Sequence, residues 1–184
     1  KATKSVNTIY LENNRVIGHN TDIGGFETSI YKSNINLENK KILILGAGGV
    51  VPSIIYALTK MKVSEITLSN RTKEKAENLK KHFKNIKIIK WGEIINFDMI
   101  INATTLGLKE KDKINLNFPS SCKNKLFYDV IYNPKETIFL KTGKNLGNNI
   151  INGKLMFIYQ ALLAFYIWHK LKPDVNEEVL KLLD

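Results

Sequence analysis

Short, continuous apolar runs along this chain alternate with segments whose apolar residues recur at helical spacing. The clearest run is KKILILG, residues 40–46, which is typical of a strand buried on both faces of a parallel sheet. The next segment, residues 46–61, begins with glycines and continues at helical spacing through Ile54, Leu58 and Met61. Further strands are predicted at residues 65–70, 85–91, 97–104 and 125–132, with an amphipathic helix at 72–83. Because parallel strands need crossover connections, this alternation predicts an α/β fold with a parallel sheet covered by helices.

The first part of the chain follows a different pattern. Residues 5–20, SVNTIYLENNRVIGHN, predict two strands joined by a turn at Glu12, Asn13 and Asn14. Two strands alone are marginally stable in water. We therefore expect this hairpin to belong to a sheet whose other strands are not in this sequence.

Composition narrows the class of protein. The chain has 184 residues, of which 43% are hydrophobic and 24% charged, as in a soluble globular protein with one sizeable core. The most apolar segment, residues 155–168, is bracketed by Lys154 and His169 and interrupted by Gln160, so it is shorter than the roughly 18 residues of a membrane span. Nothing resembles a signal peptide, and the single cysteine, Cys122, fits a reducing compartment. We expect a cytoplasmic protein without a membrane partner, in which Cys122 has no chemical role.

The net charge of +11 raises the question of nucleic-acid binding. The lysines, however, are spread along the chain, and only Arg15 and Arg71 among the 28 basic residues are arginines. We interpret the charge as a solvated lysine surface and expect no nucleic-acid partner.

Glycines follow the clearest strand directly, at Gly46, Gly48 and Gly49, with Ala47 among them. In a dinucleotide-binding loop the first glycine permits the tight turn and the second lets a pyrophosphate approach the helix N-terminus. The third position of that fingerprint is Val51, where glycine or alanine is usual, so the helix is expected to pack less closely there. An ordinary strand-to-helix turn is the alternative.

Arg71 stands at the end of the second strand, where a dinucleotide fold that prefers NAD carries an acidic residue. The residues at this point are Asn70, Arg71 and Thr72, with Lys75 one helical turn further on. A guanidinium binds a phosphate through two parallel hydrogen bonds and can stack on adenine. These residues therefore predict NADP as the cofactor, unless Arg71 is simply a surface residue at the start of a helix.

Seven stretches, in order along nearly the whole chain, resemble the shikimate dehydrogenase family. They are VNT (6–8), GHNTDIGGF (18–26), GAGG (46–49), NRTKEKA (70–76), INATTLGL (101–108), YDVIYNP (128–134) and INGKLMFIYQALLAF (151–165). The resemblance implies a Rossmann-like NADP-binding domain over residues 22–184, preceded by a remnant of the substrate-binding domain over residues 1–21. It also implies NADPH-dependent reduction of 3-dehydroshikimate to shikimate, on the route to chorismate and the aromatic amino acids.

The resemblance also assigns roles to individual residues. Asn7, Asp22, Gln160 and Tyr132 would bind the substrate, and Asp22 would also be half of a catalytic lysine–aspartate pair in which it stays ionised. Residues of the glycine loop (Gly46, Ala47, Gly48, Gly49), of the stretch after the second strand (Asn70, Arg71, Thr72, Lys75) and elsewhere (Thr104, Leu106, Gly153) would bind the cofactor. Plainer roles remain open for three of them: Asp22 as a helix start, Gln160 as a core amide and Tyr132 as a packing residue.

The chain departs from the family pattern in three places. Lys4 and Leu155 stand where the family has glycines, and Leu155 is expected to narrow the nicotinamide pocket. The family's N-terminal segment, with its serine pair and its catalytic lysine, is not in this sequence, so we expect the 184 residues to be inactive without it. A quinate/shikimate dehydrogenase that uses NAD and a non-catalytic NADP-binding module remain alternatives. His19, His82 and His169 show no metal-binding spacing, and no metal site is expected.

Overall fold

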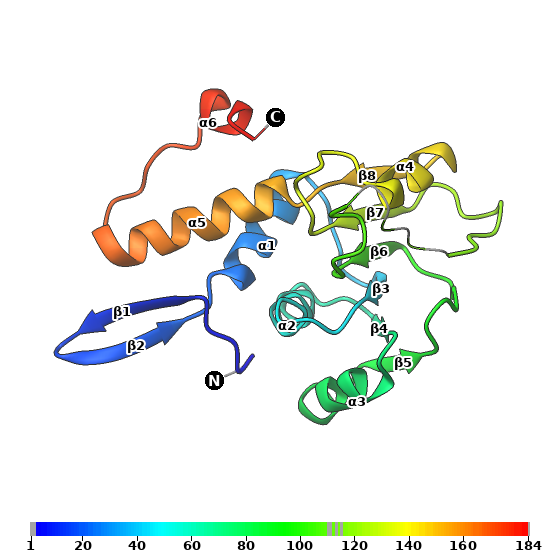
Figure 1. The fold of residues 1–184 in the computed structure, drawn as a ribbon, viewed down its shortest axis with the longest axis horizontal. Helices are drawn as coiled ribbons and strands as arrows, with labels where there is room; N and C mark the ends of the chain where they lie inside the picture. The colour runs from blue at the N-terminus through cyan, green and yellow to red at the C-terminus, as the bar shows by residue number, and fades with distance from the viewer. Residues whose placement is uncertain (1–2, 110–111, 113, 115, 184) are drawn as a thin grey trace.

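The computed structural model describes residues 3–109, 112, 114 and 116–183 and confirms an α/β fold (Figure 1). A six-stranded parallel sheet has the order β5-β4-β3-β6-β7-β8. Its strands are β3 (Lys41–Leu45), β4 (Glu65–Ser69), β5 (Lys87–Ile89), β6 (Met99–Asn102), β7 (Leu126–Asp129) and β8 (Asn149–Ile151). The helices are α1 (Asp22–Lys32), α2 (Val51–Lys60), α3 (Lys73–His82), α4 (Ile138–Asn145), α5 (Lys154–His169) and α6 (Glu177–Lys181).

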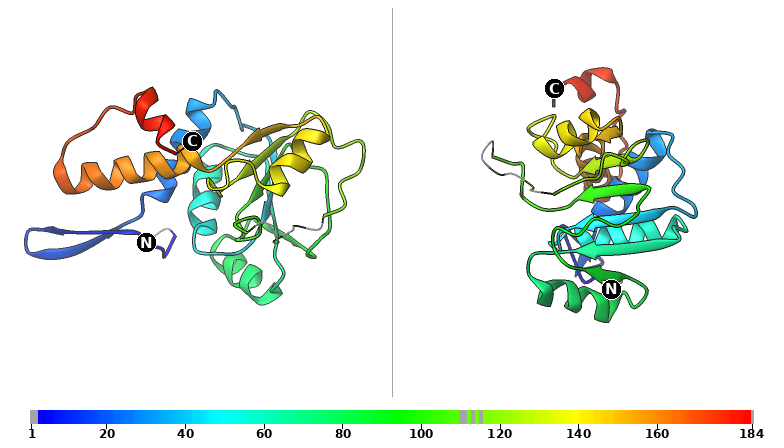
Figure 2. Two further views of the ribbon diagram at one scale, coloured as in Figure 1. Left: turned by 45° about the horizontal axis from the view of Figure 1, so that its top comes forward. Right: turned by 90° about the vertical axis from the view of Figure 1, so that its right-hand side faces the viewer.

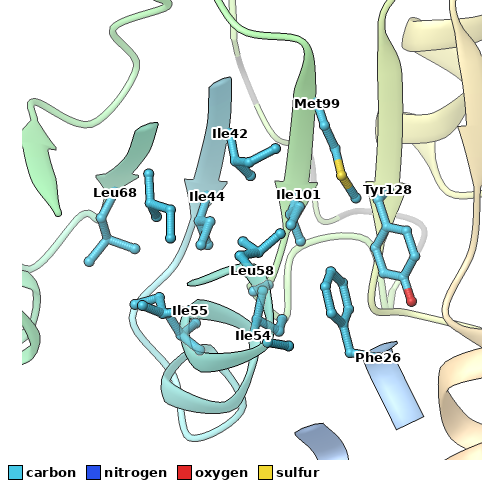
Figure 3. Packing of buried hydrophobic residues seen from close by; sticks show 14 of the residues in the cluster. Phe26, Ile42, Ile44, Ile54, Ile55, Leu58, Leu68, Met99, Ile101 and Tyr128 are labelled. Carbon is cyan, nitrogen blue, oxygen red and sulfur yellow. The ribbon is translucent and has the colours of Figure 1, made fainter. Parts of the chain in front are cut away.

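Side chains of the central strand β3 alternate between two cores. Ile42 and Ile44 belong to the core on the side of α1 and α2, whereas Leu43 and Leu45 belong to the core on the side of α4. All four are at most 1% exposed, because the strand is covered on both faces. Figure 3 shows the first core, where α2 side chains meet the sheet beside Phe26 and Tyr128.

Glycines bring α1 and α5 into close contact. A Cβ on Gly25 would lie 2.8 Å from Gln160 Cβ, and one on Gly24 would lie 2.5 Å from Leu163 Cδ1. At Gly25 a Cβ would also lie 2.8 Å from the Met156 carbonyl oxygen, so a larger residue there would push the helices apart. The two glycines therefore place the start of α1 beside the middle of α5.

The predicted hairpin is confirmed as β1 (Thr8–Glu12) and β2 (Arg15–His19), which pair antiparallel outside the main sheet. Asn13 and Asn14 form the turn with φ values of 50° and 59°, the left-handed pair that a two-residue hairpin requires. The hairpin and α5 extend from the sheet on the same side (Figure 2). Trp168 Nε1 donates a hydrogen bond to the Ile9 carbonyl at 3.0 Å, which ties the two elements together.

Three elements were not predicted from the sequence: α4, β8 and α6. β8 has three residues and α6 five, too few for a periodic pattern to stand out. Among the described residues, no helix is long and apolar enough to cross a membrane.

Candidate functional site

A cavity of about 400 Å³ lies at the carboxyl ends of four adjacent strands, β5, β4, β3 and β6. Strand order reverses there, because the chain runs outward from β3 through β4 to β5 and then returns to β6 on the other side of β3. Open α/β sheets bind dinucleotides at this kind of switch point. The lining comes from the segments after β3 (46–48), after β4 (70–72 and Lys75), after β5 (Trp91) and after β6 (103–106).

Gly46 is required by the backbone at this point. It has φ of +108°, and a Cβ on it would lie 2.7 Å from the Ala103 carbonyl oxygen. In contrast, a Cβ on Gly48 would be 3.8 Å from that oxygen, and one on Gly49 would meet nothing within 4 Å. The second part of the loop therefore leaves open space beside its backbone, as the approach of a pyrophosphate would require.

Helix α2 begins just after this loop, at Val51, with Pro52 in its first turn. Val51 is fully buried in the core. At the position where the fingerprint has glycine or alanine, the helix is thus held against the sheet through a valine side chain.

The basic side of the cavity is formed by Asn70, Arg71, Thr72 and Lys75. Asn70 Nδ2 donates to the Thr72 carbonyl at 2.7 Å, which shapes the turn into α3. Thr72 is the N-cap of α3 but its side chain makes no capping hydrogen bond, and Arg71, Thr72 and Lys75 are all exposed. No carboxylate is among the described residues that line the cavity. A phosphate there would meet cations and polar groups without an opposing negative charge.

The opposite side of the cavity is the segment after β6, where Asn102 fixes the backbone. Asn102 Oδ1 accepts hydrogen bonds from Thr104 N at 3.1 Å and Thr104 Oγ1 at 2.7 Å, and its Nδ2 donates to the Leu106 carbonyl at 3.1 Å. Asn102 is fully buried. The Asn102 side chain therefore holds the predicted residues Thr104 and Leu106 in place. The sequence analysis did not single out Asn102.

The predicted substrate residues Asn7, Asp22 and Gln160 lie in one polar cluster where the hairpin, α1 and α5 meet. Asn7 Nδ2 donates to Asp22 Oδ1 at 2.8 Å, and Asn7 Oδ1 accepts from the Thr21 amide at 2.9 Å. The Thr21 hydroxyl lies 3.3 Å from Gln160 Oε1 and 3.1 Å from Asn7 Oδ1. Burial raises the pKa of the Asp22 carboxyl above its usual value, and the hydrogen bond from Asn7 opposes that rise.

Tyr132 and Gly153 lie beyond β7 and do not line the 400 Å³ cavity. The Tyr132 ring stacks on Phe157 of α5, with ring centroids 4.3 Å apart. A Cβ on Gly153 would lie 2.0 Å from the Val130 carbonyl oxygen, so packing requires glycine at this position.

Leu155, which the sequence analysis expected to narrow the nicotinamide pocket, does not line this cavity either. It lines a separate cavity together with Leu140, Ile151 and Leu180. None of the residues lining that cavity lines the first one.

Sequence reasoning also missed Asp129 and Trp91. Asp129 ends β7 and is fully buried; burial raises the pKa of its carboxyl to about 6, against hydrogen bonds from Thr137, Ile131 and Asn102 that lower it. Its signal in the sequence was an acidic residue at the end of an apolar strand, at the same sheet edge as Asn102. In the described part of the chain, no three His, Cys, Asp or Glu side chains come together in a way that would hold a metal ion.

The chain resembles known proteins over its whole length. The profile of the Shikimate / quinate 5-dehydrogenase family matches residues 29–135. The shikimate dehydrogenase (NADP(+)) of Pelagibacter ubique is 61% identical over 182 residues, which cover 99% of this chain and 69% of that protein. The enzyme of the same name from Methanococcus maripaludis is 37% identical, over 95% of this chain and 66% of that protein.

Two solved structures have the same fold. Shikimate dehydrogenase from Aquifex aeolicus superposes with a TM-score of 0.84 at 35% identity, covering 99% of this chain and 67% of that one. Shikimate 5-dehydrogenase from Thermus thermophilus, solved with NADP(H) and shikimate, gives 0.86 at 29% identity, covering 100% of this chain and 70% of that one. The chain thus spans about two thirds of the length of the proteins it matches.

Proposed function

The chain belongs to the shikimate/quinate 5-dehydrogenase family, and we propose that it is the NADP-binding part of an enzyme that interconverts 3-dehydroshikimate and shikimate. NADPH, when bound, supplies the hydride that reduces the ketone. The residues of this chain bind the nucleotide, orient the substrate and hold a carboxylate beside it.

The observation that carries the proposal is the position of Arg71 at the cavity. Arg71 and Lys75 lie beyond β4, one strand away from the glycine loop, where the adenosine ribose of a dinucleotide is bound in this fold. Their charges and the hydroxyl of Thr72 suit a 2′-phosphate, and the described lining lacks the carboxylate that would bind the 2′-hydroxyl of NAD. This favours NADP over the NAD-dependent alternative.

At the substrate end, we assign the cluster of Asn7, Asp22 and Gln160 to the substrate hydroxyls, and we assign Tyr132, which stacks on Phe157 of α5, as a further substrate contact. The Asn7 amide donates one hydrogen bond to the Asp22 carboxylate and has a second proton for a substrate hydroxyl, while the carboxylate can accept from a neighbouring hydroxyl. Asp22 is the first residue of α1 and is half-buried, so its charge is only partly solvated.

Reduction of a ketone leaves charge on its oxygen, which needs a positioned acid or cation. Burial raises the pKa of Asp22, and the hydrogen bond that opposes this rise comes from the Asn7 amide rather than from a cation. A neighbouring ammonium would reverse the rise. We assign the proton donor to a lysine outside these 184 residues, in accordance with the family resemblance, so that this chain alone binds NADP and reduces 3-dehydroshikimate negligibly.

The test is the loss of NADPH absorbance with 3-dehydroshikimate, for the 184 residues and for the longer protein with the upstream segment joined to them. We expect nucleotide binding by both and turnover only by the longer protein. Comparable turnover by the short chain would place the acid within the 184 residues. Equal turnover of both proteins with NADH would overturn the cofactor assignment.

A further inference from the structure

Among the described side chains outside the loop, Asn102 alone forms hydrogen bonds to Thr104 and Leu106. The carboxamide uses both lone pairs of Oδ1 and both protons of Nδ2, so its capacity for hydrogen bonds is complete. The Thr104 hydroxyl donates to Asn102 Oδ1 and in turn accepts from the Leu106 amide at 3.0 Å. The shape of this loop therefore depends on which way the Asn102 amide points.

Asp129 constrains that direction from outside the loop. Its Oδ1 accepts from Asn102 Nδ2 at 3.0 Å and from the Ile131 amide at 3.0 Å, and its Oδ2 accepts from the Thr137 hydroxyl at 2.6 Å. A carboxylate only accepts hydrogen bonds, so it excludes the flipped amide, whose oxygen would face Asp129 Oδ1. Both side chains are fully buried, which leaves no water to satisfy a flipped arrangement.

The two residues connect neighbouring strands. Asn102 and Asp129 are paired in register at the ends of β6 and β7, on the side of the switch point away from Arg71. Asp129 also holds the backbone of Ile131, next to Tyr132, and Thr137, which caps α4 by accepting from the Leu140 amide at 3.3 Å. One buried carboxylate thus joins the loop at the cavity to the segment that carries Tyr132.

We propose that Asp129 is a positioning residue for the dinucleotide, which fixes the Asn102 amide and thereby holds residues 104–106 in the shape that lines the cavity. This inference rests on the proposed function, because it takes that cavity to be the NADP site. Burying a carboxylate is costly, and three hydrogen bonds offset that cost here, one of them from the Asn102 amide.

The experiment separates the two halves of the nucleotide. NADPH spans the cavity, whereas adenosine 2′,5′-bisphosphate needs only the side formed by Asn70, Arg71 and Lys75. Asp129→Leu keeps the number of side-chain heavy atoms and removes the acceptor, and we expect it to weaken NADPH binding about tenfold while leaving the bisphosphate within about twofold, as for the loss of one buried interaction. Binding is measured by calorimetry, with Trp91 fluorescence as a second readout because Trp91 lines the cavity.

Two variants serve as matched controls. Asp129→Asn can turn its NH₂ toward Thr137 and keep its oxygen toward Asn102, so NADPH affinity should stay within about threefold of the original. Thr137→Val removes the hydrogen bond to the other carboxylate oxygen and the cap of α4. It should lower stability without lowering nucleotide affinity, which separates positioning from general destabilisation.

The inference is overturned if Asp129→Leu binds NADPH as tightly as the original chain, or if it loses both ligands to the same extent. If Asp129→Leu does not fold, the affinities of Asn102→Ala for NADPH and for the bisphosphate provide the test. This variant removes the side chain that links Asp129 to residues 104–106. Failure of the unaltered chain to bind either ligand would overturn the proposed function as well.

Discussion

Asn7 donates a hydrogen bond from Nδ2 to Asp22 Oδ1 at 2.8 Å and thereby joins the segment leading into β1 to the first turn of α1. The Asn7 side-chain oxygen accepts from the Thr21 amide, so the same residue also holds the turn that precedes the helix. A carboxylate at a helix N-terminus is stabilised by the helix dipole, but burial raises the pKa of Asp22 nonetheless. The effect of desolvation on the pKa of Asp22 is therefore larger than the opposing effect of the hydrogen bond from Asn7.

We expect Asn7→Ala to raise the pKa of Asp22 further, because it removes the interaction that lowers it. The carboxyl carbon of Asp22 can be followed by NMR during a pH titration. Asn14→Ala, in the exposed turn of the hairpin, is the control and should leave that titration unchanged. A pKa that stays constant or falls in Asn7→Ala would show that Asn7 does not stabilise the charged form.

Arg71→Asp should weaken NADP(H) binding by about 1.5–3 kcal/mol, the scale of a hydrogen bond to a charged group, and should affect NAD(H) much less. The other arginine provides the matched control, since Arg15 lies exposed in β2 and does not line the cavity. Titration of both nucleotides against fluorescence measures the two affinities. If Arg71→Asp and Arg15→Asp lower NADP affinity equally, the effect is one of net charge and the assignment of Arg71 is wrong.

Leu155→Gly is expected to leave NADPH affinity unchanged, because Leu155 lines a cavity that is separate from the one at the switch point. It should lower the free energy of unfolding by about 1 kcal/mol from helix propensity alone, and by more where the side chain packs. Calorimetric binding and urea denaturation measure the two effects. A tighter complex with NADPH would instead support crowding of the nicotinamide by leucine.

Asp129→Asn should change how stability depends on pH. The pKa of Asp129 is raised from 3.8 to about 6 in the folded state, so the folded chain binds this proton more tightly than the unfolded chain does. The stability from that proton is complete below pH 3.8 and is lost as the pH rises through about 6.

Relative to the original chain, Asp129→Asn should therefore gain up to about 3 kcal/mol in unfolding free energy between about pH 4 and pH 8. Urea unfolding at several pH values measures this difference. Asp174→Asn, at an exposed carboxylate, serves as the control. If the difference between Asp129→Asn and the original chain does not change with pH, Asp129 does not titrate in this range.

The sequence predicted the parts of the fold that depend on local pattern. The strands around KKILILG and the turn at Asn13 and Asn14 were recognisable because each carries its own periodicity or backbone preference. The sequence pattern alone could not predict that Asn102 and Asp129 would lie side by side, since the pairing of β6 with β7 follows from the order of strands in the sheet. That Leu155 lines a cavity separate from the one at the switch point could not be predicted from its position along the chain either, because the packing of α5 decides it.

Lys4→Gly should stabilise the chain, because Lys4 has φ of 51°. A left-handed backbone costs a residue with a Cβ about 1–2 kcal/mol, and glycine avoids this cost but loses about 0.4–1 kcal/mol through the greater freedom of the unfolded chain. The net gain in the free energy of unfolding should be roughly 0.5–1 kcal/mol, which urea denaturation can resolve with replicate curves. Lys123→Gly is the control, since Lys123 is an exposed loop lysine outside the left-handed region and should only lose stability. A loss for Lys4→Gly as large as that for Lys123→Gly would mean that the Lys4 side chain forms interactions that outweigh the strain of its backbone.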